Sequence, residues 1–181
     1  MNGLVLAGGY STRMGRTKAL IPQSGDTWLT RTAQLLAPYC EQVWVSCRTE
    51  QQTELSAAPW HGPWIFDRPE WTHTGPMNGL LSAMKAQGGD WWVLACDYPL
   101  LTADDMDFMW EQSRPDALAT VFRNREGFLE ALLGIYRAPA LPFLEDWVKK
   151  GHFSLQYFCR MHEVQVLDAP FPERLQNVNS L

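Results

Sequence analysis

The sequence lacks the marks of several large classes of protein. No apolar run approaches the roughly 20 residues that a membrane-spanning helix needs, and no charged leader with an apolar core precedes Gly3. The four cysteines (Cys40, Cys47, Cys96 and Cys159) form no C-x-x-C pair, and neither they nor the four histidines show the spacing of a zinc site. We therefore expect a protein without membrane association in the reduced cytoplasm.

A surplus of positive charge is also absent. The chain has 15 lysines and arginines against 20 aspartates and glutamates, which gives a formal net charge of -5. Proteins that bind the backbone of nucleic acids carry broad basic surfaces, so we expect no nucleic-acid partner. A small polyanionic substrate is still compatible with this charge, because only its own site need be positive.

No internal repeat, low-complexity tract or linker divides the chain, so we predict a single domain over residues 1–181. Strand-like apolar runs alternate with helical patterns, which predicts an α/β fold with a parallel sheet wrapped by helices. We expect Met106, Met109 and Trp110 to face inward from one helix. The predicted strands are 4–7, 42–47, 64–66, 91–96, 117–122, 130–136 and 162–167, and the predicted helices are 27–37, 50–55, 76–87, one from residue 102 through 110, and one through 144–148.

The most informative stretch is residues 4–18, L-V-L-A-G-G-Y-S-T-R-M-G-R-T-K. A strand that stops at paired glycines can turn sharply and leave backbone N–H groups bare for an anion. Arg13, Arg16 and Lys18 add cations to the same loop, so we expect it to hold a nucleoside triphosphate. The glycine spacing fits neither the Walker pattern nor the dinucleotide fingerprint. The alternative is a glycine-rich turn with solvated basic residues.

Two aspartates stand where predicted strands end. Asp97 follows the most apolar strand, 91–96, and Asp67 follows the strand 64–66. Ligands of open parallel sheets bind beyond the carboxyl ends of the strands, so both carboxylates should meet the loop after residue 7. Because Mg²⁺ takes few protein carboxylates, we predict Asp97 as its ligand. The alternatives are that Asp97 caps a turn before Pro99 and that Asp67 is solvated.

The pattern L-A-G-G-x-S-x-R-M-G-x-x-K, together with Cys96-Asp97-Tyr98-Pro99, resembles the molybdenum cofactor guanylyltransferases of the MobA-like nucleotidyltransferase family. The resemblance implies a single three-layer α/β/α domain with a Rossmann-like, mostly parallel sheet of the nucleotide-diphospho-sugar transferase type. It also implies a nucleotide-binding half over residues 1–100 and an acceptor half over residues 101–181.

The resemblance assigns roles to individual residues. It implies Arg13, Lys18 and Asp97 as catalytic residues, and Asn177 and Asn179, in an N-V-N tail typical of the guanylyl branch, as acceptor-binding residues. The nucleotide-binding residues that it implies are Leu6, Ala7, Gly8, Gly9, Lys18, Asp67, Gly75 and Asp97, with Mg²⁺ on Asp97.

The reaction that the resemblance implies is the transfer of GMP from GTP to the phosphate of molybdopterin, with release of pyrophosphate. Proteins of molybdopterin synthesis or molybdoenzyme maturation are the partners that it suggests. Two alternatives stay open: a molybdopterin cytidylyltransferase or sugar-phosphate nucleotidyltransferase, and a nucleotide-binding adaptor without catalysis that serves cofactor-inserting proteins.

The sequence departs from the family pattern in three places. Thr17 stands where the family usually has aspartate, and the tail lacks a T-P-E-D continuation after its last asparagine. No arginine after Gly151 matches the family's basic residue there. Arg123 and Arg125 are candidates to meet the pterin phosphate, although they fit a solvated turn equally well.

Overall fold

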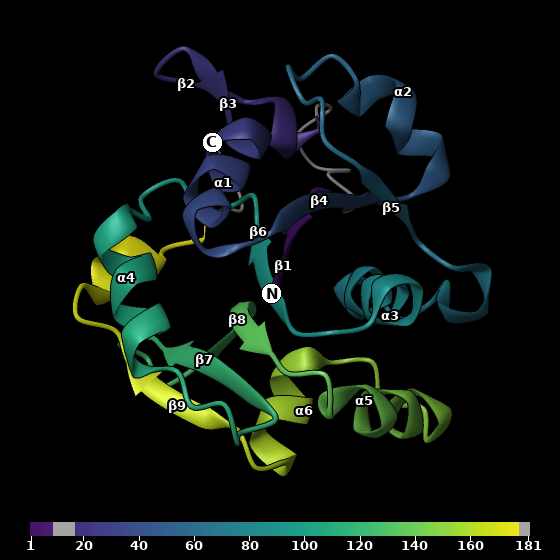
Figure 1. The fold of residues 1–181 in the computed structure, drawn as a ribbon, viewed down its shortest axis with the longest axis vertical. Coiled ribbons are helices and arrows are strands. Elements are labelled where there is room, and N and C mark those ends of the chain that lie inside the picture. The colour runs from purple at the N-terminus through teal and green to yellow at the C-terminus, as the bar shows by residue number, and fades with distance from the viewer. Residues whose placement is uncertain (9–16, 178–181) are drawn as a thin grey trace.

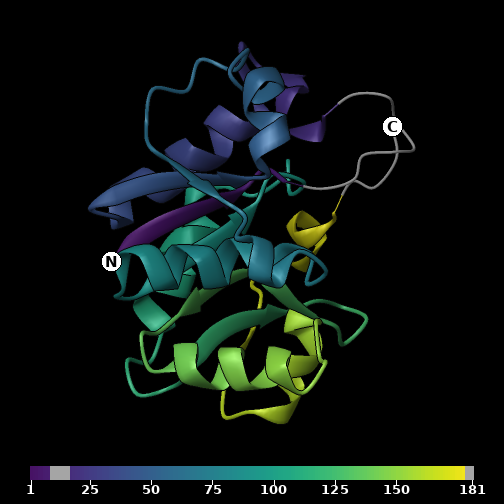
Figure 2. The ribbon, with the colours of Figure 1, turned by 90° about the vertical axis from the view of Figure 1, so that its right-hand side faces the viewer.

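A computed structural model describes residues 1–8 and 17–177 of the chain. One sheet of seven strands, in the order β5-β4-β1-β6-β8-β7-β9, divides the molecule (Figures 1 and 2). Its strands are β1 (Asn2–Leu6), β4 (Gln42–Cys47), β5 (Trp64–Phe66), β6 (Trp91–Ala95), β7 (Ala119–Arg123), β8 (Leu129–Tyr136) and β9 (Gln165–Asp168). A separate hairpin of β2 (Pro22–Gln23) and β3 (Asp26–Thr27) turns at Ser24-Gly25.

Helices cover both faces of the sheet. The α-helices are α1 (Trp28–Leu36), α2 (Gln52–Leu55), α3 (Pro76–Gln87), α4 (Ala103–Gln112), α5 (Ala140–Lys149) and α6 (Leu155–Met161). Short 3-10 helices are η1 (Lys18–Leu20), η2 (Ala37–Tyr39), η3 (Thr49–Gln51), η4 (Pro69–Trp71) and η5 (Pro172–Leu175). Figure 1 shows α1 and α4 on one side of the sheet and α3, α5 and α6 on the other, which confirms the predicted three-layer α/β/α domain.

The sheet is parallel in its first half and mixed in its second. Strands β5, β4, β1 and β6 run in the same direction, β8 is antiparallel to both β6 and β7, and β9 is parallel to β7. Leu6 pairs with Ser46 on one side and with Ala95 on the other. This register brings the residues that follow β1, β4, β5 and β6 to one edge of the sheet.

The central strand β6 is buried on both faces, as its continuous apolar sequence predicts. Helix α1 buries Leu29, Ala33 and Leu36 along one stripe against this sheet. Cys47, at the end of β4, and Cys96, which follows β6, are buried as well.

The structure corrects two expectations. Trp110 does not face the interior: it is 43% exposed at the edge of the apolar stripe of α4, where it stacks on the buried Trp92 with ring centroids 6.0 Å apart. Helix α6 was not predicted at all. The observed starts of two strands differ slightly from the predicted ones: β9 begins at Gln165 rather than at residue 162, and β7 begins at Ala119 rather than at residue 117.

Candidate functional site

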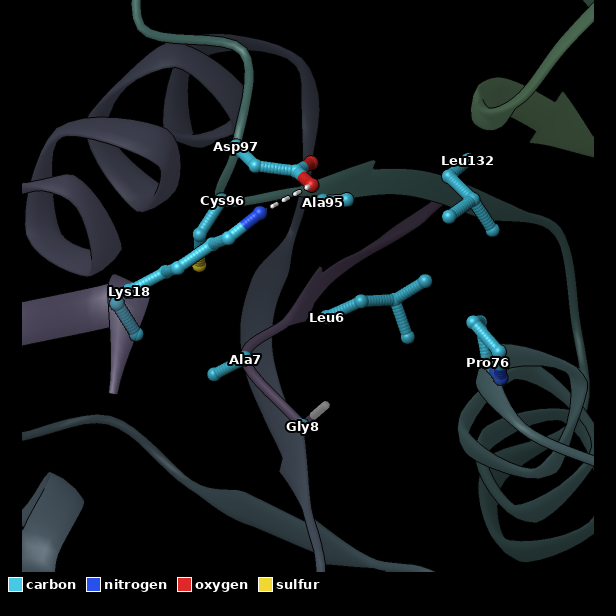
Figure 3. Close-up of a pocket in the computed structure, with 10 residues that line it drawn as sticks. Leu6, Ala7, Gly8, Lys18, Pro76, Ala95, Cys96, Asp97 and Leu132 are labelled. Carbon is cyan, nitrogen blue, oxygen red and sulfur yellow. Dashed lines mark ion pairs between the residues drawn. The ribbon is translucent and has the colours of Figure 1, made fainter. Parts of the chain in front are cut away.

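A cavity of about 210 Å³ opens where β1 and β6 end. The ends of these strands supply Leu6, Ala7, Gly8 and Asp97 to its wall, and η1 supplies Lys18 (Figure 3). Its complete lining is Leu6, Ala7, Gly8, Lys18, Ala19, Pro76, Ala95, Cys96, Asp97 and Leu132. Five of these residues were predicted for one site. The rule that parallel strands end at the same edge of a sheet brought Gly8 and Asp97 together, and the family resemblance added Leu6, Ala7 and Lys18.

Lys18 and Asp97 face each other in this cavity. The Nζ atom of Lys18 lies 3.7 Å from Oδ2 of Asp97, and each side chain is 20% exposed. Figure 3 shows the lysine reaching across the cavity from η1 toward the carboxylate at the end of β6. The pairing therefore joins residues 79 positions apart in the chain, and it sets one positive and one negative group at the same opening.

The carboxyl group of Asp97 is mostly buried. Burial raises its pKa, and this effect is opposed mainly by the charge of Lys18 and also by hydrogen bonding from the side chain of Asn177. Its Oδ1 atom is buried and makes no hydrogen bond within the described part of the chain. A buried carboxylate oxygen without a donor fits a hard divalent ion such as Mg²⁺, which needs few protein ligands. Residues 1–8 and 17–177 contain no group of three or more histidine, cysteine, aspartate or glutamate side chains that could form an all-protein metal site.

A second hollow adjoins the first on the side of β4 and β5. The two share Leu6, Gly8 and Pro76, and the second also contains Asp67. The Asp67 carboxylate accepts a hydrogen bond from the Ser46 hydroxyl at 3.5 Å. Burial raises the pKa of Asp67, and both Ser46 and the charge of Arg48 oppose the rise. Asp67 thus lies at the edge where it was predicted and is partly buried rather than fully solvated.

Two glycines shape this second hollow. Gly75 precedes α3 with φ of +58°, a conformation that glycine adopts without strain. Gly79 lies so close to the sheet that a Cβ atom there would be 2.4 Å from Ser46 Oγ and 2.8 Å from Leu6 Cδ2. The first turns of α3 therefore approach β1 and β4 closely and form a wall of the hollow.

A third hollow lies on the other side of Asp97. It shares Pro76 and Leu132 with the first cavity and contains Tyr98, Glu130 and Asn177. The Tyr98 hydroxyl donates to Glu130 Oε2 at 2.7 Å, and the Asn124 amide donates to Glu130 Oε1 at 2.8 Å. Burial and the nearby Glu130 raise the pKa of Tyr98 well above its usual value. All three hollows share Pro76 in their linings, and we call the three together the trough, which extends from Asp67 to Asn177.

Sequence reasoning missed part of this trough. It proposed no role for Ser46, Tyr98 or Glu130, although Tyr98 stands within the quoted Cys96-Asp97-Tyr98-Pro99 motif. Glu130 offered one signal, a single acid at the start of the apolar strand β8. Its contact with Tyr98 depends on the antiparallel pairing of β6 and β8, which no local sequence pattern predicts.

Other predicted site residues either differ from the expectation or lie outside the described part of the chain. The N–H groups of Ala7 and Gly8 are not bare, because both donate to the Ser46 carbonyl, at 3.0 and 3.2 Å. Gly9, Arg13, Arg16 and Asn179 lie outside the described residues.

Two arginines considered for the acceptor both form ion pairs. Arg123 pairs with Asp168 on β9 at 2.8 Å, and Arg125 pairs with Glu173 at 3.1 Å. Arg125 lies in a hollow that also contains Glu130 and Asn177, whereas Arg123 lines none of the hollows described here. Among the described residues, no helix is long and apolar enough to cross a membrane.

The family model and the similar proteins point to the same family. Residues 3–166 match the MobA-like NTP transferase domain. The chain is 34% identical over 186 residues to a molybdenum cofactor biosynthesis bifunctional protein of Synechocystis, covering 98% of this chain and 51% of that protein. It is 31% identical over 182 residues to a probable molybdenum cofactor guanylyltransferase of Synechococcus elongatus, covering 98% of this chain and 92% of that one. The chain thus spans about half the length of the bifunctional relative.

Solved structures share the fold. The molybdopterin-guanine dinucleotide biosynthesis protein A of Archaeoglobus fulgidus superposes with a TM-score of 0.77 at 21% identity, over 99% of this chain and 93% of that one. A putative protein from Aquifex aeolicus gives the same TM-score at 23% identity, over 99% and 94% of the two chains. These similarities confirm the single α/β/α architecture.

Proposed function

The chain belongs to the MobA-like NTP transferase domain family, and from this premise we propose that it transfers GMP from GTP to the phosphate of molybdopterin and releases pyrophosphate. The observation that carries the proposal is the pairing of Lys18 and Asp97 at the carboxyl edge of the sheet, 3.7 Å apart in one cavity. A cation and a metal-binding carboxylate at one opening suit a triphosphate. The name of the Synechococcus relative supports the choice of guanylyl transfer.

In the proposed reaction a phosphate oxygen of the acceptor attacks the α-phosphorus of GTP. A new P–O bond forms, the bond between the α-phosphorus and the bridging oxygen breaks, and pyrophosphate leaves with the electron pair. Such transfers depend on positioning and charge neutralisation more than on acid–base chemistry. Lys18 offsets negative charge on the triphosphate. Asp97 would hold Mg²⁺, which when bound neutralises phosphate charge and orients the reacting groups.

The trough gives each substrate a place. We assign the nucleotide to the side lined by Leu6, Ala7, Gly8, Asp67 and Gly75, and its phosphates to Lys18 and Asp97. Gly9 and Arg13, which belong to the same motif, complete the nucleotide site in this proposal. We assign the acceptor to the side of Asn177, and by the family pattern to Asn179 as well. The dispersed, mostly buried cysteines support a reaction in the cytoplasm.

The experiment is pyrophosphate release with Mg²⁺ and molybdopterin, measured separately with GTP, CTP and UTP. We expect turnover with GTP that exceeds turnover with the other two nucleotides by at least about tenfold. Preference for CTP would identify a cytidylyltransferase, and turnover with a sugar phosphate but not with molybdopterin would identify a different acceptor. Nucleotide binding without pyrophosphate release under these conditions would contradict catalysis and favour an adaptor.

A further inference from the structure

The segment after β9 returns from the edge of the sheet toward its centre. Strand β9 is the outermost strand of the sheet on one side and runs in the same direction as β6. The carboxyl ends of both strands therefore lie at the same end of the sheet, the one that carries Asp97. Residues 169–177 then follow this edge and bring Asn177 into the hollow with Tyr98 and Glu130. Because Asn177 itself is exposed, its position depends on what fixes the residues before it.

Arg174 fixes this segment to the start of α4. Its Nη1 atom donates to Thr102 Oγ1 at 2.8 Å and to Asp105 Oδ2 at 3.3 Å. Asp105 is fully buried, and the same Oδ2 atom also accepts from the N–H and the hydroxyl of Thr102, each at 3.0 Å. The guanidinium of Arg174 lies 4.0 Å from the centroid of the Phe171 ring. Hydrogen bonds from a guanidinium to a buried carboxylate are among the strong ones, so this contact holds η5 in place.

The partners of Arg174 belong to the segment that leaves Asp97. Thr102 caps α4 and ends the loop that begins at Asp97, while Arg174 lies in η5, three residues before Asn177. Leu175, between them, is 3% exposed and packs into the core. The contacts of Arg174 therefore connect the segment that follows Asp97 to the segment that leads to Asn177. Burial raises the pKa of both Asp97 and Tyr98, and hydrogen bonding from Asn177 opposes both rises, which agrees with the place of Asn177 beside Tyr98 in one hollow.

We propose that Arg174 is a positioning residue, which holds Asn177 on the acceptor side of Asp97 by binding Thr102 and Asp105. This inference rests on the proposed function for its kinetic consequence, but its structural part stands independently. Arg174 touches neither Lys18 nor the hollow around Asp67, so replacing Arg174 should weaken binding of the acceptor and leave binding of the nucleotide unchanged.

The kinetic test compares Arg174→Gln and Arg174→Lys with the wild type. Arg114→Gln is the matched control, because Arg114 forms an exposed ion pair with Asp116. The rate of pyrophosphate release is measured as a function of molybdopterin concentration at saturating GTP, and as a function of GTP concentration at saturating molybdopterin. We expect Arg174→Gln to raise the KM for molybdopterin about tenfold and to change the KM for GTP less than about twofold. Arg174→Lys should recover part of the loss, and the control should resemble the wild type. An unchanged KM for molybdopterin in Arg174→Gln would overturn the proposal.

A second measurement needs no activity. Hydrogen exchange is followed in peptides that cover residues 170–177 and the helix α4 in the same four proteins. We expect exchange in 170–177 to accelerate about fivefold or more in Arg174→Gln while most of α4 stays protected. Loss of protection throughout α4 with none in 170–177 would show that Arg174 only stabilises the helix, and it would overturn the proposal. If the wild type transfers nothing to molybdopterin, the proposed function fails, and the exchange result still decides whether Arg174 anchors the tail.

Discussion

At the scale of single residues, the site depends on two opposite charges that are held partly out of water. Lys18 and Asp97 are 3.7 Å apart and each is one-fifth exposed. Removing charges from water carries a desolvation cost that their attraction only partly offsets, so such a pair is weak evidence for stability. The arrangement is better explained by function, because a triphosphate and its metal would take up both charges.

Replacing Lys18 by Ala should slow pyrophosphate release about a hundredfold or more, because one preorganised positive group on the transferring phosphate is lost. Lys85→Ala is the control, since the half-exposed Lys85 of α3 forms its ion pair with Glu145 of α5 and lines none of the three hollows. Steady-state rates with GTP and molybdopterin measure the effect. Equal rates for the two variants would show that Lys18 does not serve the reaction.

Asp67 predicts a pH dependence of stability. Burial raises its folded-state pKa, so the folded protein binds the proton more tightly than the unfolded chain does. The cost of ionising Asp67 is absent below its unfolded pKa, grows as pH rises through the folded pKa, and is fully present above it. Asp67→Asn should therefore be more stable than the wild type at pH 7, with no such advantage at pH values below the unfolded pKa.

Urea unfolding at the two pH values measures this difference. Asp116→Asn gives the opposite sign, because the hydrogen bond with Arg114 lowers the pKa of Asp116 and stabilises its charged form. At pH 7 the asparagine variant at position 116 should be slightly less stable than the wild type. An Asp67→Asn variant that is less stable than the wild type at pH 7 would refute the assigned role of burial.

At the scale of secondary-structure elements, the approach of α3 to the sheet shapes the side of the trough that we propose for the nucleotide. Gly79 permits this approach, since any Cβ there would overlap Ser46 Oγ and Leu6 Cδ2. Overpacking of this kind typically costs about 1–3 kcal/mol. Gly79→Ala should lose stability in this range and weaken GTP binding, as measured by urea unfolding and by calorimetry.

The double variant Ser46→Ala/Gly79→Ala tests the cause of that loss. It removes the Oγ atom that stands 2.4 Å from the added methyl group, so part of the lost stability should return. If the double variant is simply the sum of its two single variants, the Ser46 contact is not what makes alanine costly at position 79.

The elements that the sequence predicted well are those whose hydrophobic pattern is long or flanked by clear signals. Strand β6 is continuously apolar, and α4 is capped by Thr102, whose N–H donates to the carboxylate of Asp105 three residues later. Helix α6 escaped prediction although Leu155, Phe158 and Cys159 stand at helical spacing and are buried. It has only seven residues, too few for its periodicity to stand out from the flanking loops.

At the scale of the whole molecule, a mostly parallel sheet places the trough at one edge. Strand direction alone brought Gly8, Asp67 and Asp97 together, and the sequence predicted that much because ligands of such sheets bind beyond the carboxyl ends of the strands. The side that we propose for the acceptor was less predictable. It depends on the antiparallel strand β8 and on the tail held by Arg174, and both are contacts between segments far apart in the chain. The division of labour between residues 1–100 and 101–181 stays a prediction.

The sheet also predicts a gradient of hydrogen exchange. Strands β1 and β6 lie inside the sheet with paired neighbours on both sides, whereas β5 and β9 are edge strands. Amides that open only on global unfolding belong to central elements, and edge elements open locally. In native-state exchange monitored by mass spectrometry, β1 and β6 should be the slowest of these strands, and β5 and β9 should exchange first. Exchange in β6 as early as in β9 would contradict this topology.

The central claim is that Asp97 holds the metal of a nucleotidyl transfer beside Lys18. The most direct measurement is the Mg²⁺ dependence of pyrophosphate release from GTP with molybdopterin, in wild type, Asp97→Ala and the exposed control Asp116→Ala. The account predicts a loss of about a hundredfold or more for Asp97→Ala that added Mg²⁺ does not restore, with the control near the wild type. Full Mg²⁺-dependent turnover by Asp97→Ala would contradict it.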